Sequence, residues 1–443
     1  MPGPYVTPVH GDAELPSEVD VVVIGGGIIG SSTALELAER GLRIALCEKG
    51  GIGKEQSSRN WGWVRISRRD PREVPLMAEA LRLWSGLNER TGRETGYRRS
   101  GIIFTCATDQ QYVDHEKWND LLAPYQLDSR MVSGSEFNNL VPGSQLDLKG
   151  ALYTAADGRA EPQLAAPAIA EAARDRGAHI LTECAVRTVE TAGGRISGVV
   201  TERGPIRCSA VVLAGGAWSN LFAGNMGINF PQLKVMNSVL RTKPIEGGPE
   251  QAIWHKDFAI RKRRDGGYTI ASGHENIVRI VPKSFRYAFD FLPALRKEWR
   301  SLNLRFGLSF LDEARIANRW TPDEPSPFEY NRVLDPVPNR KMSERALAAA
   351  IRAFPALAGA EIAQRWAGYM DVTPDAVPVI SAIDKVPGFY LASGFSGHGF
   401  GIGPAAGRLM ADLVTNSTPV VDPADFRFSR FSDGSKIELI SGF

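Results

Sequence analysis

The sequence has few of the residues that build metal sites and disulfide frameworks. Its six histidines are scattered, with no HxH or HExxH spacing, so we predict no metal centre. None of its cysteines form a CxxC pair; they are Cys47, Cys106, Cys184 and Cys208. In a chain of 443 residues this pattern is typical of reduced, buried thiols in a cytosolic protein rather than of disulfides or a zinc site.

Long apolar runs and an excess of one charge are also absent. No stretch of 18 apolar residues occurs, so we expect no transmembrane segment. The N-terminal residues lack the basic start and the apolar core of a secretory signal. Lysine and arginine number 52 against 50 acidic residues, which argues against nucleic acid as a partner. We therefore expect a cytoplasmic protein of roughly two to three domains, and peripheral attachment to the inner face of the membrane stays open.

A glycine-rich turn near the start of the chain stands in the order that a nucleotide-binding unit requires. The β-branched run Asp20–Ile24 favours a buried parallel strand. The turn Gly25–Gly30 reads GGGIIG, and Ser31–Arg40 then carries apolar residues at helical spacing. The run Arg43–Cys47 predicts a second strand, and Glu48 ends it. The order is therefore strand, turn, helix, strand and acid.

Each position in this turn has a physical role in dinucleotide binding. Gly25 permits the tight turn, Gly27 lets the backbone approach a pyrophosphate, and Gly30 lets helix and strand pack closely. The start of the helix offers free N–H groups and a positive dipole end to phosphates. Glu48 lies where an acid binds a ribose diol. The turn alone does not separate FAD from NAD, and a purely structural glycine turn is the alternative.

Two further segments carry a family resemblance. Residues 151–217 predict a helix over Pro162–Arg176, a strand over His179–Leu181, a strand pair turned at Gly193–Gly194, and the buried strand and turn "SAVVLAGGAWS". Later come "WAGYMDVTPDAVPVI" and "GFYLASGFSGHGFGIGPAAGRLMADLV". In this order the segments resemble the FAD-dependent amine oxidoreductases, the superfamily of D-amino acid oxidase and dehydrogenase, glycine oxidase and monomeric sarcosine oxidase. The resemblance covers residues 20–422.

The resemblance implies an α/β fold with two discontinuous domains. One is a Rossmann-like FAD-binding domain, and the other is an inserted α+β substrate domain built on a mixed or antiparallel sheet. Within the latter, we expect a hairpin around Asp265–Gly267 and an amphipathic helix from about Pro293. The expected ranges are a flexible arm at 1–17, the FAD-binding domain at 18–100, 150–230 and 341–443, and the substrate domain at 101–149 and 231–340.

FAD is longer than one glycine turn can hold, so the resemblance implies that both glycine-rich stretches bind it. The loop Gly394–Gly403 would supply N–H groups to the pyrimidine edge of the flavin, and the helix Pro404–Val414 would add its dipole. A plain turn before a C-terminal helix is the alternative. No cysteine occurs in Gly368–Val372, where relatives with covalent flavin carry one, so we expect non-covalent FAD. The predicted FAD contacts are Gly25, Gly27, Ile29, Gly30, Glu48, Lys49, Ser57, Ser58, Arg59, Asn60, Val186, Gly215, Trp218, Gly397, His398, Gly399, Phe400 and Gly401.

The segment "SSRNWGWVRISRRD", Ser57–Asp70, is expected to pass the phosphates and then the flavin ring. Arg65 falls near the position where sarcosine-oxidase-like members carry an arginine at the flavin, and a surface salt bridge is the alternative. The other arginines of this segment and just after it are expected to be exposed charges: Arg68, Arg69 and Arg72. His398 would hydrogen-bond the flavin or tune the ionisation of the substrate, and a structural histidine is the alternative.

The sequence departs from the family where a substrate carboxylate is usually held. Gly401 stands where sarcosine-oxidase-like members have a lysine, and Tyr369, Met370 and Asp371 stand where many members have an arginine. The anchor is therefore missing or has moved. Arg261, in a basic hairpin, is one replacement because arginine grips carboxylates with two hydrogen bonds, and a solvated hairpin face is the alternative. The competing candidates are Tyr369, Arg279, Arg286 and Arg319.

Arg65, His398, Tyr369 and Arg261 are thus the candidate catalytic residues of an FAD-dependent enzyme. It would oxidise an amino acid or a secondary amine by hydride transfer from the α-carbon to flavin N5, giving an imine that hydrolyses to an oxo acid. The electron acceptor would be oxygen, a quinone or a carrier protein. A flavin-bearing electron-relay or assembly subunit of a larger dehydrogenase complex is the alternative, and an NAD-dependent dehydrogenase is a weaker one.

Overall fold

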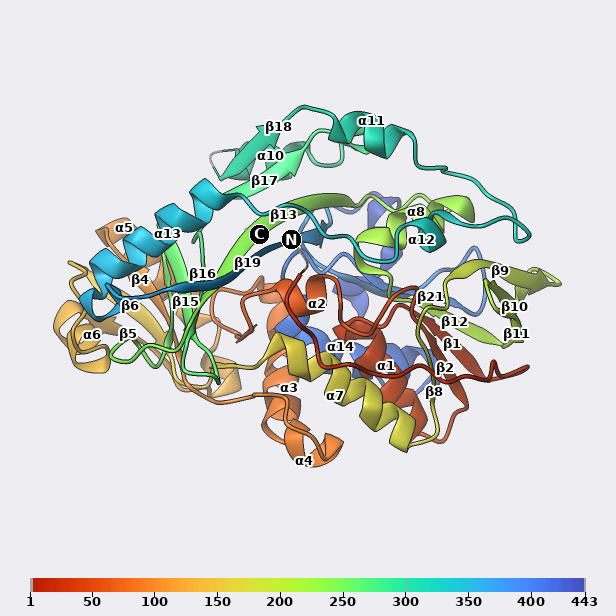
Figure 1. Ribbon diagram of the computed structural model, residues 1–443, viewed down its shortest axis with the longest axis horizontal. Coiled ribbons are helices and arrows are strands. Elements are labelled where there is room, and N and C mark those ends of the chain that lie inside the picture. The colour runs from red at the N-terminus through yellow and green to blue at the C-terminus, as the bar shows by residue number, and fades with distance from the viewer. Residues whose placement is uncertain (1–2, 300, 442–443) are drawn as a thin grey trace.

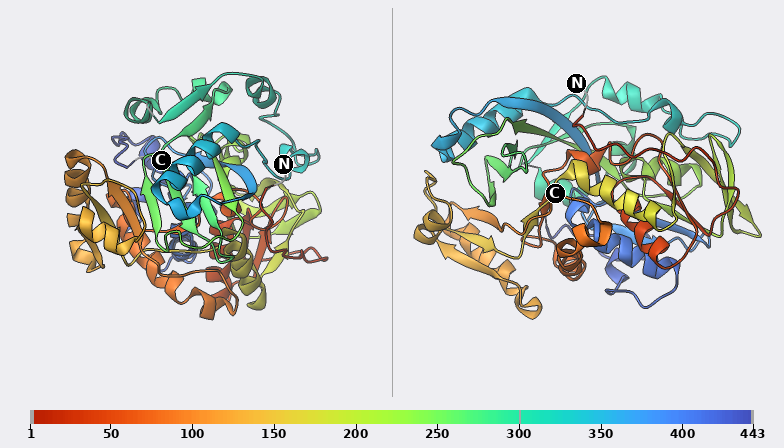
Figure 2. Two further views of the ribbon diagram at one scale, coloured as in Figure 1. Left: turned by 60° about the vertical axis from the view of Figure 1, so that its left-hand side comes forward. Right: turned by 60° about the horizontal axis from the view of Figure 1, so that its bottom comes forward.

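The computed structural model describes residues 3–299 and 301–441, and it contains two large sheets that lie side by side (Figures 1 and 2). One sheet has six strands and the other has ten. Helices cover both, as the predicted α/β class requires, and the sheets mix parallel with antiparallel pairs. The predicted fold class is thereby confirmed, whereas the division into domains stays a prediction.

The six-stranded sheet holds the predicted nucleotide-binding unit. Its first strand pairs in parallel with the strands on either side, and all three are completely buried, as their apolar runs predict. A strand from the C-terminal segment is its next neighbour, so residues distant in sequence meet in this sheet. The strand order is β20 (Val379–Ala382), β21 (Phe389–Ser393), β12 (Ala210–Leu213), β1 (Val21–Ile24), β2 (Ile44–Cys47) and β8 (His179–Leu181).

Helix α1 (Ile28–Glu39) and helix α14 (Gly399–Val414) pack against each other in parallel, beside this sheet. A Cβ at Gly403 would lie 2.8 Å from Ile28, and a Cβ at Gly407 would lie 2.6 Å from the backbone of Ser32. From the first contact to the second, both helices advance four residues toward their C-termini, so their N-termini lie at the same end. The remaining helices of this region are α2 (Gln56–Arg59), α3 (Val74–Ser85), α4 (Leu87–Thr91), α7 (Pro162–Asp175), α8 (Ser219–Asn225) and α12 (Pro327–Tyr330).

The ten-stranded sheet forms the left half of Figure 1, and β19 (Ile362–Val372) leads from it back to the six-stranded sheet. The predicted hairpin is present as β15 and β16. The other nine strands are, in order, β18 (Leu302–Arg305), β17 (Asn276–Arg279), β13 (Leu233–Thr242), β16 (Tyr268–Ala271), β15 (Phe258–Lys262), β14 (Ala252–His255), β4 (Ile102–Cys106), β6 (Gly150–Thr154) and β5 (Ser129–Ser133). Its helices are α5 (Asp109–Asp120), α6 (Gly134–Leu140), α9 (Pro282–Arg286), α10 (Leu292–Glu298), α11 (Ser309–Ala314) and α13 (Arg340–Ala353).

Two small sheets complete the fold. The predicted strand pair around Gly193–Gly194 is found, and a third strand joins it. The other small sheet pairs two residues of the segment that follows α2 with two residues that precede α7. The strands are β9 (Val186–Ala192), β10 (Arg195–Thr201) and β11 (Gly204–Arg207) in one sheet, and β3 (Trp63–Val64) and β7 (Gly158–Arg159) in the other.

Two predicted boundaries are wrong. Helix α14 begins at Gly399 rather than at Pro404, because Gly397 adopts a left-handed φ of 83° and completes the turn earlier. The helix expected from about Pro293 ends at Glu298, and Leu302–Arg305 form the edge strand β18 instead. The alternating apolar residues of Leu302–Arg305 favour a strand, which pairs with β17. Residue 300, within the predicted helix, lies outside the described residues.

Residues 3–17, expected to be a flexible arm, are docked on the six-stranded region. The N–H of Thr7 donates to the carbonyl of Gln163 at 3.1 Å, and the N–H of Asp12 donates to that of Ile180 at 2.7 Å. The side chain of Val6 is buried. These backbone bonds satisfy donors that a free arm would leave to water. Residues 1–2 of the predicted arm, and residues 442–443, lie outside the described part.

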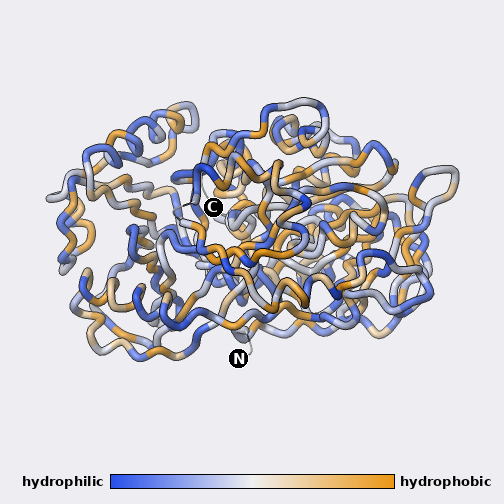
Figure 3. The backbone as a smooth tube through the Cα atoms, turned by 90° about the horizontal axis from the view of Figure 1, so that it is seen from above, coloured by the Kyte–Doolittle hydropathy of each residue, from blue (hydrophilic) through white to orange (hydrophobic). Residues whose placement is uncertain are grey.

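The hydropathy of the chain follows this arrangement. Apolar stretches, orange in Figure 3, recur through the interior, and many outer turns are polar or neutral. Within residues 3–299 and 301–441, no helix combines the length and apolar character that crossing a membrane requires.

We expect Gly407→Ala to destabilise the protein by about 1–3 kcal/mol, because the added Cβ forces α14 away from α1. Flavin content should fall with it, since both helix N-termini shift. Chemical denaturation and the absorbance of the purified protein measure the two effects. Gly224→Ala in α8 is the control, since its Cβ would meet nothing within 4 Å. Equal stability of the two variants would contradict this account of the packing.

Candidate active site

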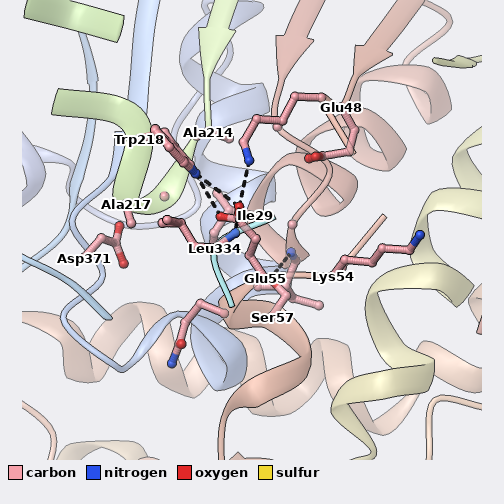
Figure 4. A pocket seen from close by; sticks show the side chains of 18 of the residues that line it. Ile29, Glu48, Lys54, Glu55, Ser57, Ala214, Ala217, Trp218, Leu334 and Asp371 are labelled. Atoms are coloured by element: carbon pink, nitrogen blue, oxygen red, sulfur yellow. Dashed lines mark hydrogen bonds and ion pairs between the residues drawn. The ribbon is translucent and has the colours of Figure 1, made fainter. Parts of the chain in front are cut away.

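One elongated cavity runs from the first glycine turn to the start of α14. Its volume is about 1320 Å³, including its opening to solvent. Gly25 and Gly27 line one end, and Gly397, Gly399 and Phe400 line the other. Figure 4 shows side chains from several elements converging on this space. The two glycine-rich stretches therefore border a single cavity, which we name the long cavity.

At the first end, the backbone of the turn is too close to its neighbours for any side chain. A Cβ at Gly30 would lie 1.9 Å from the carbonyl oxygen of Gly25, and one at Gly25 would lie 2.5 Å from that of Ala214. Helix α1 has no side-chain cap from its own N-cap residue, Gly27, and Ser57 Oγ accepts only the N–H of Ile28, at 2.8 Å. The start of α1 thus offers donors and a positive dipole end to an anion.

Carboxylates flank this end of the long cavity. Glu48 accepts hydrogen bonds from the N–H groups of Gly26 at 2.7 Å and Gly50 at 2.8 Å, and burial raises the pKa of its carboxyl. Glu55 accepts from Lys49 Nζ at 2.7 Å and from Trp218 Nε1 at 3.1 Å (Figure 4). Sequence reasoning missed Glu55, because nothing in the local pattern shows that distant Trp218 and Leu334 also donate hydrogen bonds to it.

Most of the predicted FAD contacts line the long cavity. Gly30 and Ser58 lie outside the residues that line it, since Gly30 supports the turn and the carbonyl of Ser58 accepts from Gln163 Nε2 at 2.6 Å. His398 and Gly401 line a second cavity instead. The predicted contacts that line the long cavity are Gly25, Gly27, Ile29, Glu48, Lys49, Ser57, Arg59, Asn60, Val186, Gly215, Trp218, Gly397, Gly399 and Phe400.

At the far end, Asp371 on β19 holds the turn before α14. Its carboxylate accepts from the N–H of Gly394 at 2.7 Å and from Ser393 Oγ at 3.2 Å, and burial raises its pKa. Helix α14 has His398 as its N-cap, with no side-chain cap. The first N–H groups of this helix therefore stay available at the cavity, where they would stabilise negative charge on a ligand.

A second cavity, the polar cavity, adjoins the first. Its volume is about 800 Å³, and the two cavities share Gln56, Arg59, Asn60, Gly397 and Phe400 as a common wall. Alternation along β19 sends successive residues to opposite sides: Gly368 and Met370 line the polar cavity, and Tyr369 and Asp371 line the long one. Trp63, Arg65, Arg69, Asn237, His398 and Gly401 also line the polar cavity.

Arg65 lines the polar cavity without a counter-ion. Its guanidinium lies 5.4 Å from the centre of the Phe104 ring, and its hydrogen bond goes to the carbonyl of Ser67. Burial, together with the nearby charge of Arg69, lowers the pKa of Arg65 to about 9, although Asp157 and Glu73 oppose the change. Among the described residues no carboxylate forms an ion pair with Arg65, which argues against the alternative of a surface salt bridge.

Arg69, expected to be exposed, is instead buried at 3% exposure in the wall of the polar cavity. Its Nη2 donates to the carbonyl of His398 at 3.2 Å, and its Nη1 lies 3.9 Å from Glu73. A Cβ at Gly401 would lie 3.2 Å from the carbonyl oxygen of Trp63 and 3.4 Å from Arg69 Nη2. The Arg69 guanidinium is therefore one of the groups that lie beside the position of Gly401. We expected an exposed charge because the local sequence does not show that the start of α14 lies beside this arginine.

The expected exposure of Arg68 and Arg72 is also wrong. Arg68 is half-buried and donates to the carbonyl of Asp114 at 3.2 Å. Arg72 is half-buried too and pairs with Asp70 at 2.8 Å and with Asp375 at 3.7 Å. Neither residue lines the long or the polar cavity. Each arginine therefore has a partner on a distant segment, Asp114 for Arg68 and Asp375 for Arg72.

His398 and Glu73 form a buried pair beside Arg69. His398 Nδ1 lies 3.1 Å from Glu73 Oε2, and within the described residues the other ring nitrogen, Nε2, has no hydrogen-bond partner. Burial lowers the pKa of His398, Arg69 lowers it further, and Glu73 raises it. A neutral ring with Nδ1–H bonded to Glu73 leaves the Nε2 lone pair free. Sequence reasoning missed Glu73, which lies 325 positions from His398.

The structure separates Arg261 from both cavities. This side chain is 1% exposed; its Nη1 pairs with Glu161 at 2.8 Å, and its Nε donates to the carbonyl of Trp61 at 2.7 Å. Each of its charged N–H groups has a protein acceptor, so the expectation that Arg261 anchors a carboxylate is wrong.

The other competing anchors also lie away from the polar cavity. Tyr369 and Arg279 line a small hollow of about 350 Å³ beside β17. Arg286 donates to Asn229 Oδ1 at 2.9 Å, and Arg319 donates to the carbonyl of Asn225 at 2.5 Å. Tyr369 also lines the long cavity, which leaves it beside the predicted flavin site rather than beside Arg65.

This combination of a nucleotide-binding sheet with a cavity that reaches α14 defines a class of flavoproteins. A family model described as FAD dependent oxidoreductase matches residues 20–413, so the chain belongs to the FAD-dependent oxidoreductase family.

Individual relatives agree with this assignment. The chain is 26% identical to mitochondrial sarcosine dehydrogenase of Mus musculus over 97% of its own length but only 43% of that protein, so it spans less than half of this relative. It is 27% identical to glycine oxidase of Pseudomonas aeruginosa, over 92% of this chain and 97% of that one. The structure of L-amino acid deaminase from Proteus myxofaciens in complex with anthranilate superposes with a TM-score of 0.94 at 34% identity, covering 97% of both chains.

We expect Arg261→Met to destabilise the protein by about 3–5 kcal/mol, because Glu161 stays buried without its main partner. Denaturant unfolding measures the change. The double variant Arg261→Met with Glu161→Gln should recover much of the loss, since it removes both charges. An Arg261→Met protein as stable as the wild type would show that this ion pair is not structural.

Proposed function

We propose that this protein is an FAD-dependent enzyme that oxidises an amino acid, with a primary or secondary amine, to an imine that hydrolyses to an oxo acid. The observation that carries the proposal is the common wall between the long cavity and the polar cavity. A ligand that fills the first cavity would present its far end to a chamber with two arginines that have no full counter-charge. The relatives, a sarcosine dehydrogenase, a glycine oxidase and an L-amino acid deaminase, support amino acids as the substrate class.

The residues of the long cavity suit FAD. The start of α1 would hold the diphosphate, Glu48 the ribose diol, and the start of α14 the pyrimidine edge. When bound, FAD supplies the acceptor for the hydride that leaves the α-carbon. We expect the cofactor to be held without a covalent bond, because the cysteine that lines this cavity, Cys47, lies beside the nucleotide turn on β2.

Arg65 and Arg69 would bind the carboxylate of the substrate. Both guanidinium groups line the polar cavity, and within the described residues Arg69 Nη1 and Trp63 Nε1 have no hydrogen-bond partner. Leaving buried donors unpaired is costly, and a carboxylate would satisfy them with charge-assisted bonds. The two arginines would take the role that a lysine at the position of Gly401 has in sarcosine-oxidase-like members.

The amine would face the acceptors of the same cavity. His398 Nε2, Gln56 Oε1 and Asn237 Oδ1 all lack a partner in the described part of the chain. His398 Nε2, with its lone pair free, would take the proton from the ammonium group and leave the amine neutral. Gln56 and Asn237 would orient the amine so that the α-carbon faces the common wall.

Anaerobic mixing with a panel of L- and D-amino acids and N-methyl amino acids tests this proposal. We expect at least one to bleach the flavin absorbance, with an oxo acid as the product. Arg69→Met should raise the substrate concentration for half-maximal bleaching by about 10- to 100-fold, because a charge-assisted bond to the carboxylate is lost. Arg69→Lys should recover part of that affinity.

The matched control is Arg68→Met, which changes a half-buried arginine of the same segment outside the polar cavity. Its affinity for the substrate should equal that of the wild type. If no amino acid or amine bleaches a flavin-loaded chain, the proposed activity is wrong, and the flavin-bearing electron-relay or assembly subunit becomes the better reading.

The pH dependence of bleaching tests the role of His398. Protonation of Nε2 at low pH would stop it from accepting the ammonium proton, so the rate should fall on the acid side. The charged groups around the ring are two cations, Arg65 and Arg69, which lower the pKa of His398, and one anion, Glu73, which raises it. Because Glu73 raises the pKa of His398, Glu73→Gln should move the acid limb to lower pH.

Glu79→Gln is the control for this profile, since Glu79 pairs with Arg82 and Arg408 away from His398. Its acid limb should coincide with that of the wild type. A shift of the Glu73→Gln limb to higher pH, or no shift at all, would remove His398 from the proposed proton transfer.

A further inference from the structure

A third cavity lies between the N-terminal segment, residues 3–9, and the hairpin of β15 and β16. Its volume is about 1000 Å³, including its opening to solvent. Residues at the start of α7, on β13 and on β19 complete its wall. It shares no lining residue with the long cavity or the polar cavity, so the proposed chemistry does not use it. We name it the basic cavity, because of the charges that line it.

Three arginines and two carboxylates line the basic cavity: Arg241, Arg263, Arg264, Glu161 and Asp265. The two carboxylates are already shared. Glu161 lies 2.8 Å from Arg261, the buried arginine behind the wall. Asp265 is divided between Arg241 at 3.5 Å and Arg263 at 3.3 Å. The guanidinium groups around the cavity therefore outnumber the carboxylates that line it.

The arginines that line the basic cavity are also loosely paired. In the described part of the chain, none of their ion pairs is shorter than 3.3 Å. Arg263 lies 3.8 Å from Glu161, and Arg264 lies 3.8 Å from Glu94. Burial and the positive charge of a neighbouring arginine lower the pKa of Arg263. Positive charge that protein carboxylates neutralise only in part favours an anion at this place.

Two uncharged groups of the wall also suit a ligand. Gln163 is 8% exposed, and within the described residues its Oε1 has no hydrogen-bond partner. An unpaired buried acceptor costs free energy, which a hydroxyl or amino group of a ligand would recover. The ring of Tyr5 is 77% exposed and offers a face on which a flat group would stack.

We propose that the basic cavity binds a small multivalent anion, and that the bound anion braces the N-terminal segment and α2. The guanidinium groups come from β13 and from the hairpin turn, so they approach a ligand from two elements. Each planar guanidinium can donate two parallel hydrogen bonds to the oxygens of a phosphate or a carboxylate. The ligand would therefore carry two or more negative charges, as a phosphate compound or a polycarboxylate does.

Hydrogen bonds connect the wall of the basic cavity with α2. Gln163 Nε2 donates to the carbonyl of Ser58 at 2.6 Å, and Trp366 Nε1 donates to that of Arg59 at 3.0 Å. The carbonyl of Gln163 accepts from the N–H of Thr7 at 3.1 Å, in the N-terminal segment. Helix α2 in turn contributes to the common wall of the other two cavities. A ligand that restrains Gln163 would thus restrain both segments.

Isothermal titration calorimetry of the full-length, flavin-loaded protein at low ionic strength tests the site. The probes are inorganic phosphate, AMP, citrate and, as a monovalent anion, acetate. We expect at least one multivalent probe to bind at least about tenfold more tightly than acetate, and its affinity to fall with added salt. Tighter binding of AMP than of phosphate, lost in Tyr5→Ser, would indicate a phosphate ester with a flat group. Tightest binding of citrate would indicate a polycarboxylate, and either result supports the site.

The variant Arg241→Gln with Arg264→Gln should bind the best probe at least about tenfold more weakly, because two charge-assisted contacts are lost. Lys243→Gln with Lys262→Gln is the matched control. These lysines neighbour the same two segments of chain but do not line the basic cavity. The control should bind as the wild type does. Arg69→Met should also bind the probe unchanged, since Arg69 lines the polar cavity instead.

Amide hydrogen exchange locates the bound anion. At saturating probe, exchange should slow in residues 3–9 and in residues 56–60, because both segments are hydrogen-bonded to the wall. Exchange in α13, which does not border the basic cavity, should stay unchanged.

Several outcomes would overturn the proposal: no preference for multivalent anions, equal affinity of the Arg241 and Arg264 double variant, or loss of binding in Arg69→Met. Protection from exchange that is absent from residues 3–9 and 56–60 would overturn it too. Binding is measured without turnover, and the double variant should bleach with amino acids as the wild type does. Failure of the bleaching would therefore count against the proposed function and not against the anion site.

Discussion

The parallel packing of α1 on α14 is the constraint on which the cofactor site depends. Because residues 403 and 407 are glycines, α14 packs closely against Ile28 and the backbone of Ser32 on α1. The N-termini of the two helices lie at the same end. Two positive dipole ends therefore face one cavity, although the helices begin 371 positions apart at Ile28 and Gly399. The pairing of β21 with β12 holds the same alignment from the side of the sheet. A long, doubly anionic cofactor is the ligand that such an arrangement favours.

The arginines in the interior of this protein are of two kinds: one is paired within the fold, and the others border a cavity. Arg261 is neutralised by Glu161 and hydrogen-bonded by neighbouring oxygens, so its charge is used within the fold. Arg65 and Arg69 border a cavity; Arg65 has no ion pair among the described residues, and the carboxylate paired with Arg69, Glu73, lies 3.9 Å away and is shared with His398. Burying a guanidinium without full compensation costs free energy that a bound carboxylate would recover. This difference in counter-charge, rather than burial itself, is the basis of our proposal that the second pair binds the ligand.

Local pattern predicted the elements that consist of strong, uninterrupted signals. The run from β1 through α1 to β2, helix α7, and the hairpin of β15 and β16 all follow from apolar periodicity and glycine turns. Boundaries failed where long-range contacts decide them: α14 starts at Gly399 because of a left-handed residue at Gly397, and Leu302–Arg305 form a strand because β17 offers an edge. Exposure failed for Arg69, since the residues that cover it come from α14, more than 300 positions away.

The sequence by itself determined the class of fold and the nucleotide turn, because strand, glycine turn and helix are read from neighbouring residues whose sterics are local. It also exposed the loss of the family's lysine, at Gly401. Only the tertiary structure decided which arginines border the polar cavity. A guanidinium can reach a cavity from any element that folds beside it: Arg69 does so from the segment before α3, whereas Arg261 pairs with Glu161. Side-chain charges are paired through space, so spacing along the chain does not reveal which of them stay unpaired.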